Sequence, residues 1–112
     1  MSVHEILKRI TKDSGEDFPP LLRELPDAPT QLYIRGQLPP AEYVRLAVVG
    51  SRTCTAYGKQ ALRYLIEGLR GCPIVVVSGL AYGIDAEAHR AAMAAGLPTM
   101  AVPGSGLDWS VL

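Results

Sequence analysis

The sequence predicts an α/β fold in which a parallel sheet is flanked by helices, as in Rossmann-like domains. Three apolar runs, at residues 46–49, 74–77 and 99–102, have the length and composition of buried strands. Two amphipathic stretches separate these runs, and each run ends at a loop that contains glycine. Apolar strands that alternate with helices are typical of a parallel sheet covered on both faces, with right-handed crossovers. We therefore expect three βα-type units after a short N-terminal lead-in.

The two helices are predicted from the spacing of their apolar residues and from their end signals. Residues 59–70 place four apolar side chains on one helical face: Leu62, Leu65, Ile66 and Leu69. Asp85 is suited to the N-cap of the second helix, which runs through Ala94 and stops at Gly96.

The first 31 residues differ in character from the rest. We interpret residues 1–31 as a lead-in that packs on the main body, and residues 32–112 as the Rossmann-like domain. The lead-in holds several helix-breaking residues: Gly15, Pro19, Pro20, Pro26 and Pro29. Its apolar residues at helical spacing predict a short amphipathic helix: Val3, Ile6, Leu7 and Ile10. Residues 21–25 are predicted to form a helical turn, and residues 32–35 a short strand closed by Gly36.

Composition limits the classes of function. With 112 residues, 48% hydrophobic and 20% charged, the chain has room for one folded domain and does not resemble a disordered segment. Eleven basic and eleven acidic residues cancel, so a site for a polyanion must be a local patch. The start has no basic leader, and the longest apolar run is too short to span a bilayer. Two cysteines without metal-ligand spacing suit a reducing compartment, so we expect a cytoplasmic protein without a membrane partner.

The loop Gly50-Ser51-Arg52 follows a predicted strand and precedes a predicted helix. Unpaired N–H groups at a helix N-terminus favour a phosphate or a carboxylate, and Arg52 adds a planar, bidentate donor. The loops after residues 77 and 102 should lie at the same sheet edge, where ligands of such folds bind. None of the three matches GxGxxG with its acidic partner or the GxxxxGK[ST] loop, so a standard NAD or ATP site is not expected. We predict no cofactor and no metal cluster.

Asp85 and His89 lie four residues apart and therefore share one helical face. They form either an acid/base pair, or a helix cap and a packed histidine whose ring nitrogens are satisfied. We favour the second interpretation, because the sequence contains no GxSxG elbow and no Cys/His pair that would define a reacting atom.

Five groups of residues occur in the order typical of the DNA-processing protein A (DprA/Smf) family, which this chain resembles. The groups are 18–25, 32–36, 48–52 with 57–58, 78–85 with 88–89, and 101–102 with 104–108. The resemblance covers nearly the whole chain from Phe18, and the combination of the Gly-Ser-Arg loop with the 78–85 loop is highly specific. It implies single-stranded DNA binding on a Rossmann-like domain and loading of the RecA recombinase during natural transformation. It does not imply catalytic activity.

Carried over to this sequence, the resemblance implies DNA-phosphate contacts from three loops: Gly50, Ser51, Arg52, Ser78, Gly79, Gly104, Ser105 and Gly106. Tyr57 and Tyr82 either stack on bases or pack against the core and its rim. Lys59 and Arg63 either extend a basic track or belong to a solvated helix face. The implied partners are single-stranded DNA, a RecA-type recombinase and a second copy of the chain in a homodimer.

The chain also departs from the family pattern. Family members continue well past Leu112 and usually follow the Gly-Leu-Asp stretch with Tyr-Pro, where this chain has Trp109-Ser110. We therefore expect a fragment, a truncated product or a minimal variant, with a sheet edge open to pairing. The alternative function is that of an enzyme or sensor that binds a nucleotide or another small phosphate compound in the same crevice.

Overall fold

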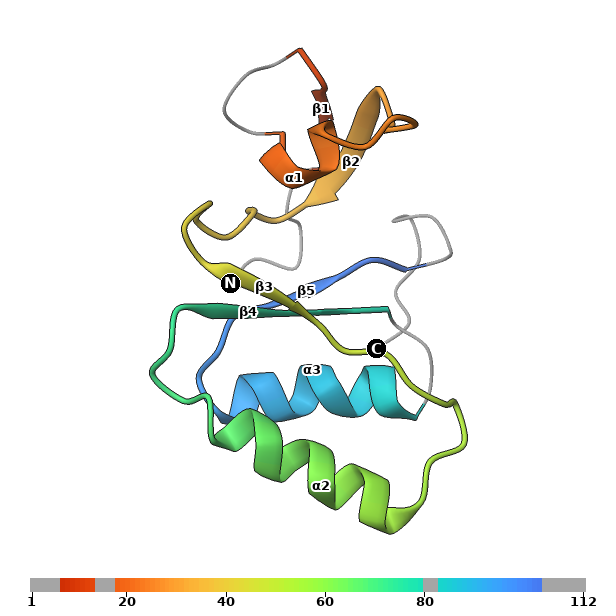
Figure 1. Cartoon of the computed structure of the whole chain (residues 1–112), viewed down its shortest axis with the longest axis vertical. Coiled ribbons are helices and arrows are strands. Elements are labelled where there is room, and N and C mark those ends of the chain that lie inside the picture. The colour runs from red at the N-terminus through yellow and green to blue at the C-terminus, as the bar shows by residue number, and fades with distance from the viewer. Residues whose placement is uncertain (1–6, 14–17, 80–82, 104–112) are drawn as a thin grey trace.

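The structure is a computed structural model that describes residues 7–13, 18–79 and 83–103. A two-stranded antiparallel sheet joins β1 (Leu7–Thr11) to β2 (Gln31–Arg35), with the short helix α1 (Pro20–Arg23) between them in sequence. A three-stranded parallel sheet has the order β3 (Val44–Ala47), β4 (Ile74–Ser78) and β5 (Thr99–Ala101). Helix α2 (Ala56–Glu67) connects β3 to β4, and α3 (Ile84–Ala94) connects β4 to β5. The predicted α/β class with a parallel sheet flanked by helices is confirmed (Figure 1).

The strands of the parallel sheet are shifted by up to two residues from the predicted ranges. β3 begins at Val44, two residues earlier than expected, because Val44 already pairs with Ile74. After β3 ends, the Val48 amide still donates to the carbonyl of Val77 at 2.8 Å. Two complete βα units are present, and β5 opens the third, whose continuation past residue 103 lies outside the described residues.

Both long helices lie on the same face of the parallel sheet, which corrects the expectation of helices on both faces (Figure 1). The two crossovers step in the same direction, from β3 to β4 to β5, and crossovers of one hand then place their helices on one side. The N-terminal sheet lies on the other side (Figure 1).

None of the helices in the described ranges has the length and apolar character needed to cross a membrane.

The main core lies between α3, α2 and β4. It is built largely from alanines at or just after α3, together with three larger side chains: Ala88, Ala91, Ala92, Ala95, Ile66, Val76 and Leu97. Small alanine side chains let α3 approach the sheet and α2 closely. On the predicted apolar face of α2, Ile66 is buried and Leu62 and Leu69 pack against the core. Leu65 differs from the prediction because it is 66% exposed.

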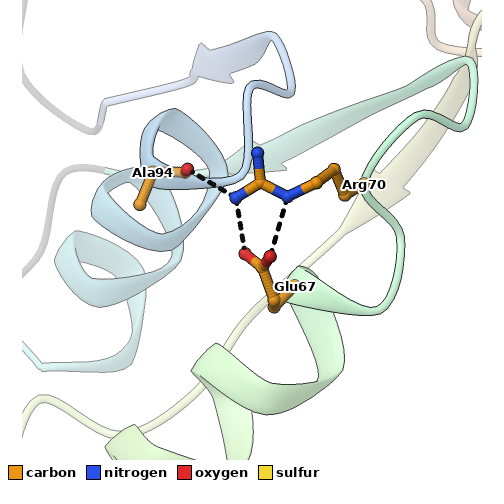
Figure 2. Close-up of polar contacts among 3 residues, drawn as sticks. All are labelled: Glu67, Arg70 and Ala94. Atoms are coloured by element: carbon orange, nitrogen blue, oxygen red, sulfur yellow. Dashed lines mark hydrogen bonds and ion pairs between the residues drawn. The ribbon is translucent and has the colours of Figure 1, made fainter.

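Arg70 forms an exposed ion pair with Glu67 at the end of α2 and also links this end to α3 (Figure 2). Arg70 donates from Nε and from one terminal nitrogen to the two oxygens of Glu67, at 2.7 and 2.9 Å. It also donates to the Ala94 carbonyl at 2.9 Å, at the end of α3. The hydrogen bond from Arg70 lowers the pKa of Glu67, and the same bond raises the pKa of Arg70. A cation placed here also complements the helix dipoles.

The predicted N-terminal helix is wrong for residues 7–11, which form β1, while Val3 and Ile6 lie outside the described residues. β1 pairs along its whole length with β2, so tertiary pairing overrides the local helical spacing. The division of the chain at residue 31 remains a prediction, and the β1–β2 pairing crosses it. The predicted helical turn is present but ends at Arg23.

The Arg45 side chain on β3 forms hydrogen bonds with the backbone of residues 39–43, which connect the two sheets. Arg45 donates from one terminal nitrogen to the carbonyls of Pro40 and Tyr43, each at 2.8 Å. Its other terminal nitrogen donates to the carbonyl of Pro39 at 3.0 Å. The backbone of residues 39–43 therefore folds around the guanidinium of Arg45.

Candidate functional site

The loop after β3 is shaped by two hydroxyl side chains. Ser51 Oγ donates to the Thr53 carbonyl at 3.0 Å and accepts the Thr53 amide at 3.1 Å. Thr55 is the N-cap of α2, and its Oγ1 accepts the Gly58 amide at 3.0 Å. The amides of Ala56 and Tyr57 at the first turn have no acceptor within the helix. The Ser51 hydroxyl thus holds the turn that leads into an open helix N-terminus.

A close contact joins this loop to the start of α3. The Ile84 amide donates to the Ser51 carbonyl at 3.1 Å. A Cβ at Gly50 would lie 2.6 Å from the Ile84 side chain, and a Cβ at Gly83 would lie 2.3 Å from the Ser51 carbonyl oxygen. Gly83 has φ +82° and ψ −129°, a conformation open in practice only to glycine. The absence of side chains at both glycines is what lets the two loops touch.

Arg52 is placed at this junction with its side chain in solvent. It is exposed, and within the described ranges its guanidinium has no hydrogen bond or ion pair. Tyr57, in the first turn of α2, is 79% exposed. Lys59 is half-buried on the next turn. The residues after β3 therefore offer a cation and an aromatic ring near the open start of α2.

Ser78 and Gly79 hold the strand ends together. Ser78 is 4% exposed, and its hydroxyl donates to the Val48 carbonyl at 2.5 Å. The Ser78 carbonyl accepts the amide of Val102 at 2.9 Å. A Cβ at Gly79 would lie 2.8 Å from Asp85 Oδ2, so the Asp85 carboxylate lies against Gly79. The carboxyl ends of β3, β4 and β5 are thereby held together at one edge of the sheet. The Asp85 carboxylate lies beside the end of β4.

His89 is a buried and satisfied histidine. It is 5% exposed, with Nδ1 2.5 Å from Thr99 Oγ1 and Nε2 2.6 Å from the Gly79 carbonyl oxygen. Nε2 donates to that carbonyl, because a carbonyl oxygen only accepts. Both ring nitrogens are thus engaged away from Asp85, which favours the packed interpretation over the acid/base pair. Asp85 is not the N-cap as predicted: Gly83 is, and Asp85 lies in the first turn of α3, where its charge complements the helix dipole.

Arg63 takes part in the contact between the two long helices. Its Nε lies 2.9 Å from Glu87 Oε1, and Glu87 is largely buried on α3. Its charge is therefore partly compensated within the fold.

Tyr82, Gly104, Ser105 and Gly106 lie outside the described residues. Three residues of this site were not singled out from the sequence: Ile84, Thr55 and Thr99. Thr55 carries a recognisable signal, since threonine is a favoured N-cap residue. Ile84 and Thr99 carry none, because their roles depend on contacts between segments distant in sequence. Groups of three or more histidine, cysteine or acidic side chains able to hold a metal are absent from the described part of the chain.

The fold and these loops define a Rossmann-like α/β protein with glycine-containing loops locked together at the carboxyl edge of a parallel sheet. The family model for DNA recombination-mediator protein A matches residues 9–111. The chain belongs to this family.

Individual relatives agree with the family assignment. The DNA processing protein DprA of Streptococcus pneumoniae is 45% identical over 91 residues, which are 81% of this chain and 32% of that protein. Protein Smf of Escherichia coli is 40% identical over 94 residues, 84% of this chain and 25% of that protein. The chain therefore spans a third or less of the length of these two relatives.

Two solved structures share the fold. The X-ray structure of DprA from Streptococcus pneumoniae has a TM-score of 0.84 and 39% identity, covering 94% of this chain and 36% of that one. The structure of DNA processing protein A from Helicobacter pylori, a study of its single-stranded DNA binding mode, has a TM-score of 0.74 and 28% identity. It covers 99% of this chain and 48% of that one.

Proposed function

We propose that this chain binds single-stranded DNA at the carboxyl edge of its parallel sheet, with Arg52 holding a backbone phosphate. The observation that carries the proposal is the contact between Ser51 and Ile84, which fixes the loop while the Arg52 guanidinium stays in solvent. Because the loop backbone is already fixed, only the Arg52 side chain has to be ordered when a phosphate binds. Arginine suits a phosphate because its planar guanidinium can donate two parallel hydrogen bonds. The DNA binding mode studied in the Helicobacter pylori relative supports the choice of ligand.

The charge distribution divides the site into two parts. On the side of β3, Arg52, Lys59 and the open start of α2 attract an anion. On the side of β4, the Asp85 carboxylate lies against Gly79 and repels one. We therefore assign the phosphate to Gly50, Ser51 and Arg52, with Tyr57 positioned to stack on a neighbouring base.

The residues of the other two loops enter the proposal differently. Ser78 and Gly79 shape the edge, since the Ser78 hydroxyl and the Gly79 carbonyl are engaged inside the fold. Gly104, Ser105 and Gly106 remain proposed phosphate contacts that complete the site from the side of β5. All of these residues fall within the proposed Rossmann-like domain, residues 32–112.

The wider role proposed here is that of the family. We propose a non-catalytic, cytoplasmic DNA-binding protein that serves DNA uptake in natural transformation. Loading of a RecA-type recombinase and homodimer formation are proposed as partner interactions. They rest on family membership, and the matched residues cover only 32% and 25% of the two relatives described above.

Arg52→Ala tests the proposal by fluorescence anisotropy with a labelled single-stranded oligonucleotide. A hydrogen bond to a charged group contributes about 1.5–3 kcal/mol, so affinity should fall roughly 10- to 150-fold. The slope of log affinity against log salt should become shallower by about 0.7 for each phosphate that the variant no longer neutralises. Arg90→Ala removes the same charge from the exposed side of α3 and serves as the matched control. Equal affinities of the wild type and Arg52→Ala would refute the assignment.

Thermal shift measurements distinguish binding of single-stranded DNA from binding of a nucleotide or another small phosphate compound. A small ligand at about 100 times its Kd should stabilise the fold by about 2.7 kcal/mol. We expect oligonucleotides to raise the melting temperature and mononucleotides to leave it unchanged. A shift with mononucleotides alone would favour the alternative function.

A further inference from the structure

The outer face of the β1–β2 sheet carries an aromatic ring between two arginines. Side chains of directly paired residues share one face of an antiparallel sheet. Arg9 pairs with Tyr33, and Arg35 lies two residues beyond Tyr33 on β2, so all three point to the same side. Tyr33 is 56% exposed, and both arginines are exposed. The opposite face, with Ile10, is turned toward the protein.

Hydrogen bonds along this face hold the ring in place. Gln31 Nε2 donates to the Tyr33 hydroxyl at 3.4 Å, and Arg9 donates to Gln31 Oε1 at 3.3 Å. The Tyr33 hydroxyl thus reaches back two residues along β2, and the ring leans along the strand. The side chain is partly ordered before any ligand arrives, which lowers the entropy lost on stacking.

The charge of this face is one-sided, although the whole chain is neutral. This face carries Arg9 and Arg35, whereas Lys8 lies on the opposite face with Ile10. The ten residues of β1 and β2 contain no aspartate or glutamate. Within the described ranges, the Arg35 guanidinium has no hydrogen bond or ion pair. An anion that meets this face is therefore attracted without competition from a carboxylate on either strand.

We infer that this face is a second contact surface for single-stranded DNA, separate from the loops at the parallel sheet. One base stacks on Tyr33, while Arg9 and Arg35 contact the phosphates on either side of it. Single-strand binders combine aromatic platforms with flanking cations in this way, because every base offers a π face and every nucleotide a phosphate. The inference rests on the proposed DNA-binding function, since the same strand reaches both surfaces.

The experiment uses Tyr33→Ala, Tyr33→Phe and the control Tyr64→Ala, which removes an exposed tyrosine from α2. Anisotropy is measured with oligonucleotides of about 4 and about 16 nucleotides, the range of site sizes of small single-strand-binding modules. Tyr33→Ala should weaken binding of the longer oligonucleotide roughly 5- to 150-fold and leave the shorter one unchanged. Tyr33→Phe keeps the ring but loses the hydrogen bond from Gln31, so it should retain most of the affinity for the longer oligonucleotide. Tyr64→Ala should bind both oligonucleotides as the wild type does.

Two further measurements test the contact itself. In a Trp109→Phe background, Tyr33→Trp should show fluorescence quenching by the longer oligonucleotide, because a base stacks on the new ring. Arg35→Gln should reduce the salt slope by about 0.7 with that oligonucleotide.

The outcomes separate the two proposals. If Tyr33→Ala binds the longer oligonucleotide like the wild type while Arg52→Ala does not, the second surface is refuted and the loop site stands. Equal weakening for both lengths would also overturn the inference, because it would place the effect of Tyr33 on the fold or on the loop site. No binding of either length by the wild type refutes both.

Discussion

Replacing Gly83 with alanine tests whether the contact between the loop after β3 and the start of α3 holds the site together. The new Cβ would lie 2.3 Å from the Ser51 carbonyl oxygen and 2.5 Å from that of Arg52, so the backbones must separate. Separation breaks the Ile84–Ser51 hydrogen bond, which contributes about 0.5–1.5 kcal/mol. The backbone conformation adds about 1–3 kcal/mol of strain for a residue with a Cβ. The free energy of unfolding should therefore fall by roughly 2–4 kcal/mol.

Urea denaturation followed by far-UV circular dichroism measures this decrease. Gly96→Ala is the matched control: Gly96 also has a positive φ, +72°, but a Cβ there would meet nothing within 4 Å. Its cost should be limited to the left-handed backbone, about 1–2 kcal/mol. Gly83→Ala should also weaken single-stranded DNA binding, whereas Gly96→Ala should leave it unchanged.

The reasoning is refuted if the two variants lose the same stability and bind DNA equally well. That result would mean that the loops can separate without cost and that Arg52 is not positioned by this contact. A decrease in stability without a decrease in affinity would leave the contact as a structural feature and remove its role in binding.

Three other substitutions probe separate features. Asp85→Asn removes the carboxylate beside Gly79 and should tighten single-stranded DNA binding about two- to fivefold in anisotropy, so unchanged affinity would contradict the proposed charge division. His89→Ala removes two buried hydrogen bonds and should lower the unfolding free energy in urea by about 2–4 kcal/mol; a decrease under about 1 kcal/mol would speak against them. Glu67→Gln should destabilise fully above the ordinary glutamate pKa of 4.5, because the pKa of Glu67 is lowered in the folded state. The destabilisation should shrink below 4.5 and disappear once the pH has fallen through the lowered pKa. A destabilisation that persists in acid would refute this explanation.

The parallel sheet and its helices were predictable because their signals are local. Apolar runs and helical spacing identified β3, β4, β5, α2 and α3, and errors were confined to the ends. Ends depend on pairing: β3 begins at Val44 because Ile74 lies opposite it.

The N-terminal strand was not predictable from spacing alone. Residues 7–11 have apolar side chains at a spacing compatible with a helix. They form a strand because they pair with residues 31–35, which are distant in sequence. The placement of helices also escaped prediction, since it depends on the order of strands in the sheet.

The sequence singled out candidate site residues, whose roles in binding stay predictions, but it did not predict their contacts within the fold. Glycines and Arg52 stood out because their chemistry is visible in the sequence. Two contacts arise only when distant segments meet: the approach of Gly50 to Ile84, and the hydrogen bond from Ser78 to the Val48 carbonyl. The Ser78 hydroxyl donates within the fold, and a contact of Ser78 with DNA stays a prediction.

The clamp of Arg45 on the carbonyls of residues 39, 40 and 43 has a mechanical consequence. Pro39 and Pro40 already stiffen this segment. The three donated hydrogen bonds restrict its backbone further. We therefore expect the β1–β2 sheet to keep its position relative to β3. A DNA strand bound at both Tyr33 and Arg52 would then have a preferred number of nucleotides between the stacked base and the bound phosphate.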